Sequence, residues 1–400
     1  MIVHYNQMTV TYGSSILLTP GDVSSDDQER LLVAATLTLE GQILMFEDLI
    51  ARYGRRPYFL LQLSSFISQL GSNSVALKLY QEVQTELSRV GQADDVFNKV
   101  VEAFAQSTNN EVQSILQEAE KVQYVEPWKP TKAHRFPVQL PHAPAGHAEV
   151  ATKWKALMSG SNGSHIYEKY LRKLAIETNH VEGTFLLTPE SVVDIIHSGF
   201  EEGSVKVLED SGIKDIDRIK RILKDTLEAF ALLSPLVEHP ENLDAAIICS
   251  FHSCIMKTCR LNSGYTAAGE TRATTRKSVV ITGPYTIQCC PFPSVDEELH
   301  YICRMAKQWI RTWRNPFATA AWIHLILVRC HPFDDGNGHL ARLIASIPLV
   351  MRGYPPICVS SSHKSYYYDA ISRAYAGDHS ALADFLLQGM CETIAAASLW

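Results

Sequence analysis

The chain has 400 residues, of which 46% are hydrophobic and 20% charged, a balance typical of folded proteins and not of disordered ones. Its formal net charge of −7 argues against a face rich in Lys and Arg, so we expect no nucleic-acid partner. The N-terminal residues MIVHYNQMTVTYGSS lack a basic segment followed by an apolar one, and the longest apolar helix candidate, TAAWIHLILV, is too short to cross a bilayer. We therefore expect no membrane partner and a cytoplasmic or nuclear location.

The first part of the chain predicts a helical domain over residues 1–125. Its clearest helix runs from Asp26 to Tyr53, where apolar residues recur at helical spacing and a glycine follows. Three further helix candidates, at 58–70, 74–90 and 94–105, are separated by the turn-forming segments GSNS and GQAD. Because no repeat period is found, a plain helical domain is favoured over a helical-repeat scaffold.

Residues 126–150 are predicted to be an extended linker, because the stretch EPWKPTKAHRFPVQLPHAPAGH carries five prolines. Helical patterns return after it. Ser164 is expected to cap one helix, and Ser294 with Glu297 to form the capping box of a later one. Between them, the β-branched stretch SVVITGPYTI, residues 278–287, predicts a small hairpin.

The stretch HPFDDGNGHLAR, residues 331–342, separates two strongly apolar helix candidates. Pro332 cannot continue the first helix, so His331 is expected at a fixed elbow that a buried Phe333 holds in place. The Gly-Asn-Gly segment 336–338 then begins the second helix, whose first N–H groups and dipole favour an anion. A phosphate group is the natural candidate for that anion.

Two charged residues of the same stretch suit this chemistry. Arg342 lies about one helical turn beyond the glycines and can point back toward the anion. Asp335 stands directly before the glycines, where a carboxylate can hold the Mg²⁺ that accompanies nucleotide phosphates. Each feature alone is weak, because a histidine before proline and a Gly-Asn-Gly sequence are common in turns.

Together, these residues resemble the Fic family signature, HPFx(D/E)GNGRxxR. Further features similar to the family run from Ala246 to the C-terminal helix, among them GETRATTRKSVVITG, MRGYPP and YYYDAISRAYAGD. The resemblance implies an all-α fold, a Fic-type helical core with a short β-hairpin flap at 278–287, preceded by the separate N-terminal helical domain. Residues 151–240 would form an inhibitory-helix region and residues 241–400 the catalytic domain.

The resemblance also implies an activity, that of a nucleotidyltransferase that moves AMP from ATP to a Ser, Thr or Tyr hydroxyl of a protein. It makes His331 the general base, Asp335 the Mg²⁺ ligand and Arg342 the contact to the γ-phosphate. The other implied nucleotide-binding residues are Gly336, Asn337, Gly338, His339 and Tyr368, with Tyr375 also near the adenine. The implied flap residues that hold the target are Val280, Ile281, Thr282 and Gly283.

A second stretch, TNHVEG at residues 178–183, resembles the family's autoinhibitory motif, (S/T)xxxE(G/N). Thr178 and Glu182 are four residues apart and share one helical face. The resemblance implies that Glu182 pairs with Arg342 and blocks productive placement of the γ-phosphate. Without it, the simpler interpretation is an exposed glutamate at the end of a helix.

The chain departs from the signature at His339, where the family usually has arginine. A neutral imidazole offers one donor and not a cationic fork, so we expect a weaker or pH-dependent grip on phosphate. Two other interpretations stay open, namely removal of AMP from a modified target at the same site, and a catalytically weak Fic-fold scaffold. The target, the base preference and the formation of a homodimer are also left open.

Overall fold

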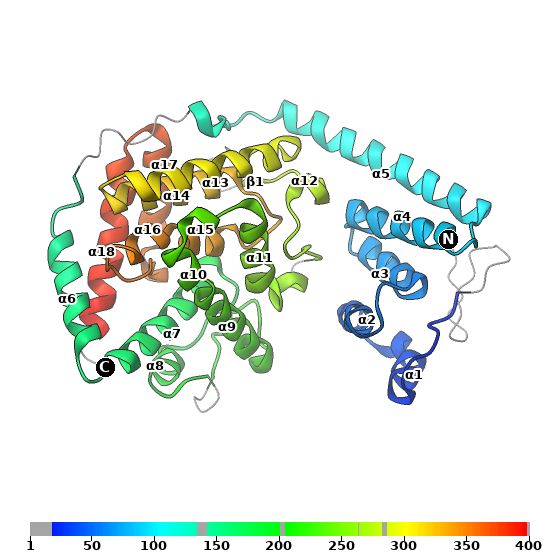
Figure 1. Ribbon diagram of the computed structural model, residues 1–400, viewed down its shortest axis with the longest axis horizontal. Coiled ribbons are helices and arrows are strands. Elements are labelled where there is room, and N and C mark those ends of the chain that lie inside the picture. The colour runs from blue at the N-terminus through cyan, green and yellow to red at the C-terminus, as the bar shows by residue number, and fades with distance from the viewer. Residues whose placement is uncertain (1–17, 134–141, 201–204, 263, 282–285, 398–400) are drawn as a thin grey trace. The chain divides into compact units, whose positions relative to one another are not determined.

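The computed structural model describes residues 18–133, 142–200, 205–262, 264–281 and 286–397 (Figure 1). The chain forms two compact units. The first comprises the chain up to Gln123 together with residues 263–267 and 274–278, and the second comprises residues 124–262, 268–273 and the chain from Val279 onward. In the described ranges, no helix combines the length and the apolar character that a membrane crossing needs.

The first unit is helical in its described part. Its elements are α1 (Ser25–Leu32), the 3-10 helix η1 (Ala34–Thr36), α2 (Leu39–Tyr53), α3 (Pro57–Gln69), α4 (Asn73–Arg89) and α5 (Asp95–Lys121). The core centres on α3, which packs between α2 and α4 and fully buries Phe59, Leu60 and Ile67. Aromatic rings extend this core, with the ring centroids of Phe46 and Phe66 5.6 Å apart.

Two helix boundaries of this unit differ from the sequence prediction. The single helix expected from Asp26 to Tyr53 is interrupted, because the Thr38 side chain accepts a hydrogen bond from Gly41 N–H at 3.2 Å and starts α2 afresh. Such a cap contributes about 1 kcal/mol, enough to select a new helix start. The helix expected to end at residue 105 instead continues to Lys121 as α5, which buries Thr108 and Val112 on its continued apolar face.

The second unit surrounds α14 (Pro316–Cys330), in which every residue except Val328 is buried. The other helices are α6 (His147–Ser159), α7 (Gly163–Glu182), α8 (Pro189–Ser198), α9 (Ile216–Ala231), α10 (Leu233–Glu238), α11 (Ala245–Met256), α13 (Val295–Thr312), α15 (Asn337–Ala345), α16 (Ile347–Val350), α17 (Lys364–Ala376) and α18 (His379–Ala397). Shorter pieces are η2 (Thr131–Ala133), η3 (Pro240–Asn242), η4 (Cys259–Leu261), η5 (Phe292–Ser294), η6 (Ser361–His363) and α12 (Arg272–Thr275), which runs from the second unit into the first.

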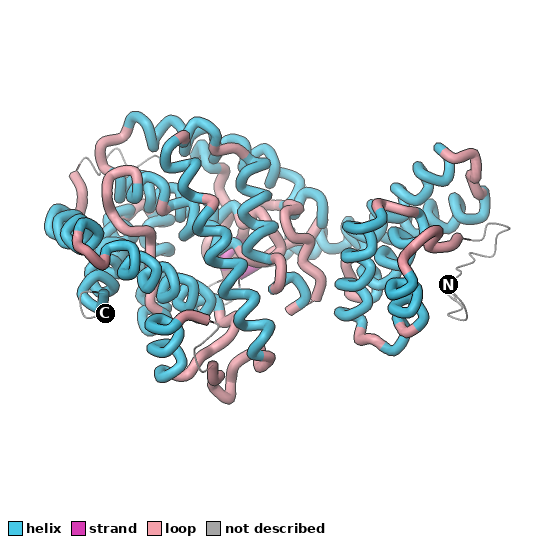
Figure 2. The backbone as a smooth tube through the Cα atoms, turned by 60° about the horizontal axis from the view of Figure 1, so that its bottom comes forward, coloured by secondary structure: helices cyan, strands magenta, loops and turns pink. Residues whose placement is uncertain are grey.

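Two short strands interrupt the helices. β1 (Val280–Ile281) and β2 (Ile287–Gln288) pair antiparallel, with Val280 opposite Gln288 and Ile281 opposite Ile287. Figure 2 shows this pair in magenta among helices. The predicted hairpin is therefore confirmed, with strands that begin two residues after the start of the predicted stretch and end one residue beyond it. Thr282 and Gly283, predicted to contact the target, lie outside the described residues.

Both predicted serine caps are wrong. Helix α7 begins at Gly163, one residue before Ser164, because a turn brings the Gly163 N–H to the Gly160 carbonyl at 3.0 Å. Ser294 precedes α13, but it closes η5 with helical backbone angles (φ −100°, ψ −4°), and its side chain accepts no bond from the helix. A capping side chain needs the extended backbone that Ser294 lacks.

Candidate active site

The predicted elbow between α14 and α15 is confirmed. His331 ends α14 in the left-handed conformation, with φ 50° and ψ 60°, which costs a non-glycine residue about 1–2 kcal/mol. Phe333 lies fully buried beneath the turn. The His331 Nδ1 lies 3.3 Å from the Val328 carbonyl oxygen, and because a carbonyl can only accept, Nδ1 carries the proton and Nε2 keeps its lone pair. Desolvation lowers the pKa of His331 to about 4, so the ring is neutral near pH 7.

Arg272, a fully buried residue that sequence analysis missed, holds this elbow. Its backbone N–H donates to the Pro332 carbonyl at 2.7 Å, and its Nε donates to the His331 carbonyl at 2.6 Å. The Nη2 donates to the carbonyls of Cys290, at 2.6 Å, and Cys330, at 3.0 Å. The guanidinium thus offsets the strain of the left-handed turn by satisfying two carbonyls at the end of α14, those of Cys330 and His331, and it ties them to the carbonyl of Cys290.

His252 of α11 holds the next part of the loop and was also missed. Its ring stacks on Phe333, with centroids 3.7 Å apart and planes 7° apart. Its Nδ1 accepts from Gly269 N–H at 2.9 Å, so Nε2 carries the proton that it donates to the Asp335 carbonyl at 3.0 Å. Burial lowers the pKa of His252 to about 4, which keeps this tautomer neutral.

At the start of α15, glycine residues leave space for another group to approach the backbone. Gly336 is the N-cap, with φ 73°, and the Asn337 side chain bridges the Phe333 N–H at 3.0 Å and the Phe333 carbonyl at 2.9 Å. The Asn337 amide therefore braces the turn. A Cβ on Gly338 would lie 1.9 Å from Glu182 Oε1, so only glycine allows this carboxylate so close to the helix start.

Glu182, the last residue of α7, forms an ion pair with Arg342, with Oε1 and Nη1 2.7 Å apart. Arg342 is 1% exposed, and it also donates through Nε to Thr178 Oγ1 at 2.9 Å and through Nη1 to Tyr367 OH at 3.2 Å. Burial acts to raise the pKa of Glu182, but the charge of Arg342 and its hydrogen bond to the carboxylate outweigh burial and lower the pKa, so the carboxylate is ionised. An anionic side chain thus occupies the N-terminal end of α15, where an anion was predicted.

His339 faces α7. Its Nε2 lies 3.2 Å from the Asn179 side-chain oxygen, its Nδ1 has no hydrogen-bond partner among the described residues, and burial lowers its pKa to about 4. The imidazole therefore adds no positive charge beside Glu182 near pH 7.

The two predicted adenine-pocket tyrosines are placed differently. Tyr368 is 46% exposed, whereas Tyr375 is buried beneath the chain at Pro127, to whose carbonyl its hydroxyl donates at 2.8 Å. Only Tyr368 therefore offers an accessible ring.

Asp335 suits a metal ion held jointly with phosphate. Its Oδ1 accepts from Gly336 N–H at 2.7 Å, which leaves Oδ2 available as a ligand. In the part of the chain that the structure describes, no group of three or more His, Cys, Asp or Glu residues could enclose a metal. This donor set fits Mg²⁺, which typically binds through one or two carboxylates together with substrate phosphates.

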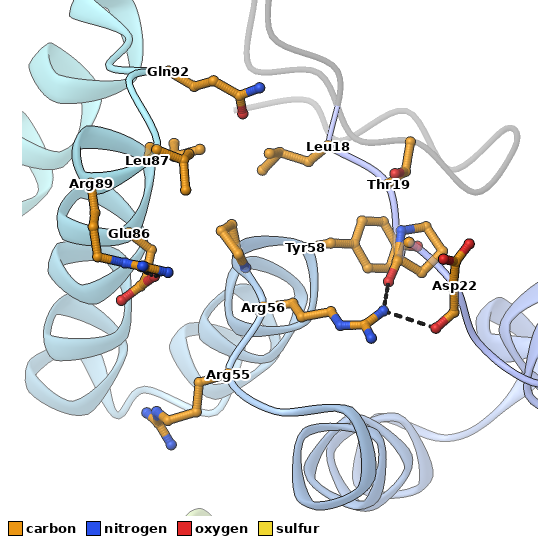
Figure 3. Close-up of a pocket in the computed structure, with 14 residues that line it drawn as sticks. Leu18, Thr19, Asp22, Arg55, Arg56, Tyr58, Glu86, Leu87, Arg89 and Gln92 are labelled. Carbon is orange, nitrogen blue, oxygen red and sulfur yellow. Dashed lines mark hydrogen bonds and ion pairs between the residues drawn. The ribbon is translucent and has the colours of Figure 1, made fainter.

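A separate cavity of about 790 Å³ lies in the first unit (Figure 3). Its arginines already have partners, since Arg56 Nη1 donates to the Pro20 carbonyl at 2.6 Å and to the Asp22 carbonyl at 3.1 Å. Arg89 pairs with Glu86 at 2.8 Å. The cavity shows none of the chemistry found around His331.

The family comparison agrees with this geometry. Residues 242–349, which lie in the second unit apart from segments near residues 263–267 and 274–278, match the Fic/DOC family model. Two curated relatives are both named protein adenylyltransferase Fic, that of Aedes aegypti, 42% identical over 64 residues (16% of this chain), and that of Drosophila persimilis, 33% identical over 85 residues (20% of this chain). The matches span 13% and 17% of those relatives' lengths.

Two solved structures are similar to this chain, and the first of them supports the fold. A Fic domain containing signaling protein from Bacteroides thetaiotaomicron has a TM-score of 0.50 and 19% identity, over 64% of this chain and 98% of its own. A structure of Fic-1 from C. elegans, residues 134–508, gives a TM-score of 0.46 and 16% identity, over 94% of this chain and 99% of its own. The predicted fold class, a helical Fic-type core with a two-stranded flap, is confirmed.

Proposed function

We propose that this chain is a protein adenylyltransferase that transfers AMP from ATP to a Ser, Thr or Tyr hydroxyl of another protein, and that Glu182 holds it inactive. The observation that carries the proposal is the position of Glu182, paired with Arg342 at 2.7 Å beside Gly338 at the start of α15. A buried arginine next to a helix N-terminus is a strong site for an anion. Glu182 occupies that site in place of a nucleotide phosphate.

Each step of the proposed reaction is assigned to residues of this chain. His331 Nε2 takes the proton of the target hydroxyl, a role worth roughly 10²–10⁴-fold in rate. The hydroxyl oxygen then bonds to the α-phosphorus of ATP as the bond to pyrophosphate breaks. The backbone at Gly336 and Gly338 receives phosphate oxygens, and Arg342, once released from Glu182, contacts the γ-phosphate. Asp335 would hold Mg²⁺, which, when bound, offsets the negative charge of the phosphates.

The target protein would bind along the flap. An extended segment adding to the edge of β1, at Val280 and Ile281, would bring its hydroxyl to His331 in the manner of β-strand addition. Ile281 is 37% exposed, so its side chain can contact such a segment.

Three proteins test the proposal: wild type, Glu182→Gly, and Glu182→Gly with His331→Ala. We expect Glu182→Gly to raise AMP incorporation from labelled ATP by roughly tenfold or more, because Arg342 becomes available to phosphate. Adding His331→Ala should reduce the rate by roughly 10²–10⁴-fold. Equal labelling by all three proteins would contradict the proposal.

The same variants distinguish the other two interpretations. If wild type releases AMP from a pre-labelled target and Glu182→Gly does not, the charged Glu182 acts by positioning water, and the enzyme removes AMP. If Glu182→Gly shows no ATP binding by calorimetry, the domain is a scaffold that lacks catalysis.

A further inference from the structure

The segment Val125–Trp128, here called the linker strand, pairs with the flap. Val125 N–H donates to the Thr286 carbonyl at 3.0 Å, and Gln288 N–H donates to the Glu126 carbonyl at 3.0 Å. Glu126 and Ile287 form a parallel bridge. The linker strand thus covers the edge of β2 that faces away from β1, although the sequence predicted only an extended linker here.

A partly buried ion pair fixes the linker strand in place. Glu126 Oε2 lies 2.7 Å from Arg329 Nη1, and the Arg329 side chain is only 4% exposed. The Tyr375 ring packs on the Arg329 guanidinium, whose carbon lies 3.6 Å from the ring centroid. The Tyr375 hydroxyl also donates to the Pro127 carbonyl at 2.8 Å and accepts from Lys129 N–H at 3.0 Å. Side chains from α14 and α17 therefore hold the middle of the linker strand, at Glu126 and Pro127.

The same arginine connects the linker strand to the catalytic elbow. Arg329 lies in the last turn of α14, two residues before His331, and its carbonyl accepts from Cys290 N–H at 3.2 Å. Cys290 follows β2 closely, and its own carbonyl binds Arg272, which holds the elbow. The register of the flap and the position of His331 thus depend on a shared set of contacts.

We propose that Glu126 is a positioning residue for target binding. Through Arg329 it locks the linker strand onto β2, which fixes the flap and leaves the outer edge of β1 as the edge that an extended segment of the target can join. Among the described residues, none pairs with that outer edge. The identity of the partner, a protein segment in extended conformation, rests on the proposed function. The fixing of the linker strand on β2 by Glu126 and Arg329, here called the lock, rests on the observed contacts alone.

The lock is tested by amide hydrogen exchange, which needs no activity. In Glu126→Ala and Glu126→Gln, we expect the Gln288 amide to exchange roughly tenfold faster or more, because the linker strand loses its ion pair to Arg329. Glu126→Asp should restore part of the protection. The control is Glu149→Gln, which breaks an exposed ion pair to Lys153 on α6 and should leave Gln288 unchanged. Unchanged exchange at Gln288 in Glu126→Ala would overturn the inference.

Target binding is tested in the Glu182→Gly background with a library of extended synthetic peptides, each carrying one Ser, Thr or Tyr. For the best-labelled peptide, Glu126→Gln should raise KM by roughly tenfold and leave the KM for ATP unchanged, a split that general destabilisation would not produce. Equal peptide KM values despite faster Gln288 exchange would overturn the positioning role. If no peptide is labelled even with Glu126 intact, the proposed function fails, and the exchange of Gln288 still decides the lock.

Discussion

At the scale of single residues, the size of each side chain decides which group can lie at the start of α15. Gly338 admits Glu182 because it has no Cβ, and Arg342 holds that carboxylate at 2.7 Å. The same opening is the one through which a phosphate would reach the backbone of α15. If the proposed function holds, Glu182 and a nucleotide phosphate would therefore compete for space as well as for charge.

This competition predicts that Gly338→Ala and Glu182→Gly have opposite effects on ATP binding. The alanine methyl would displace Glu182, because the two atoms would be 1.9 Å apart, but it would also obstruct the phosphate position. By calorimetry, we expect Glu182→Gly to bind ATP at least roughly tenfold more tightly than Gly338→Ala, a difference of about 1.4 kcal/mol. Equal affinities would show that phosphate does not approach Gly338.

Within the two motifs, the sequence indicated which residues would lie close together, whereas their roles stay predictions. Spacing alone places Thr178 and Glu182 on one helical face, and both contact Arg342. Arg272 and His252 could not be predicted in this way, because they act on backbone carbonyls of a loop distant in sequence. Which carbonyls a turn leaves without partners is decided by tertiary folding, and no local pattern records it.

At the scale of elements, α11 supports the loop between α14 and α15 through one side chain. His252 supplies both a stacked ring and two hydrogen bonds, to Gly269 and to the Asp335 carbonyl. The β-hairpin and the long helices were predictable from the sequence pattern. The role of His252 was not, because a histidine in an apolar helix is usually interpreted as a core residue.

We expect His252→Ala to lower the free energy of unfolding by about 2–4 kcal/mol, because it leaves a cavity beside Phe333 and removes the partners of the Gly269 N–H and the Asp335 carbonyl. Urea denaturation measures this change. His300→Ala, at an exposed position on α13, should change stability by less than about 0.5 kcal/mol. A similar small effect for both variants would show that the loop holds itself without α11.

At the scale of the whole molecule, the second unit buries several neutral histidines. Burial lowers the pKa of His252 to about 4, of His324 to about 3 and of His339 to about 4. The unfolded chain binds protons at these rings near pH 6.5, and the folded chain does not. Stability is therefore complete above pH 6.5 and falls as the pH drops toward 4.

The expected slope is about 1.4 kcal/mol per pH unit for each buried histidine, within that window. Urea midpoints at pH 7, 6 and 5 measure it. His324→Gln should reduce the slope between pH 6 and 5 by roughly one histidine's share, whatever it does to stability at pH 7. Identical midpoints at pH 7 and pH 5 would contradict the neutral assignment.

The chain segments 263–267 and 274–278 fold with the first unit, and the six residues between them, including Arg272, fold with the second. In the first unit, Ser72 Oγ donates to the Tyr265 carbonyl at 3.3 Å, and Arg276 Nη1 donates to Asn109 Oδ1 at 2.7 Å. Segments of the two units therefore alternate along the sequence, so no single division of the chain separates the units. A recombination event that exchanged only the N-terminal helices would leave the segments 263–267 and 274–278 without the helices that they fold with. We therefore expect the two units to be inherited together.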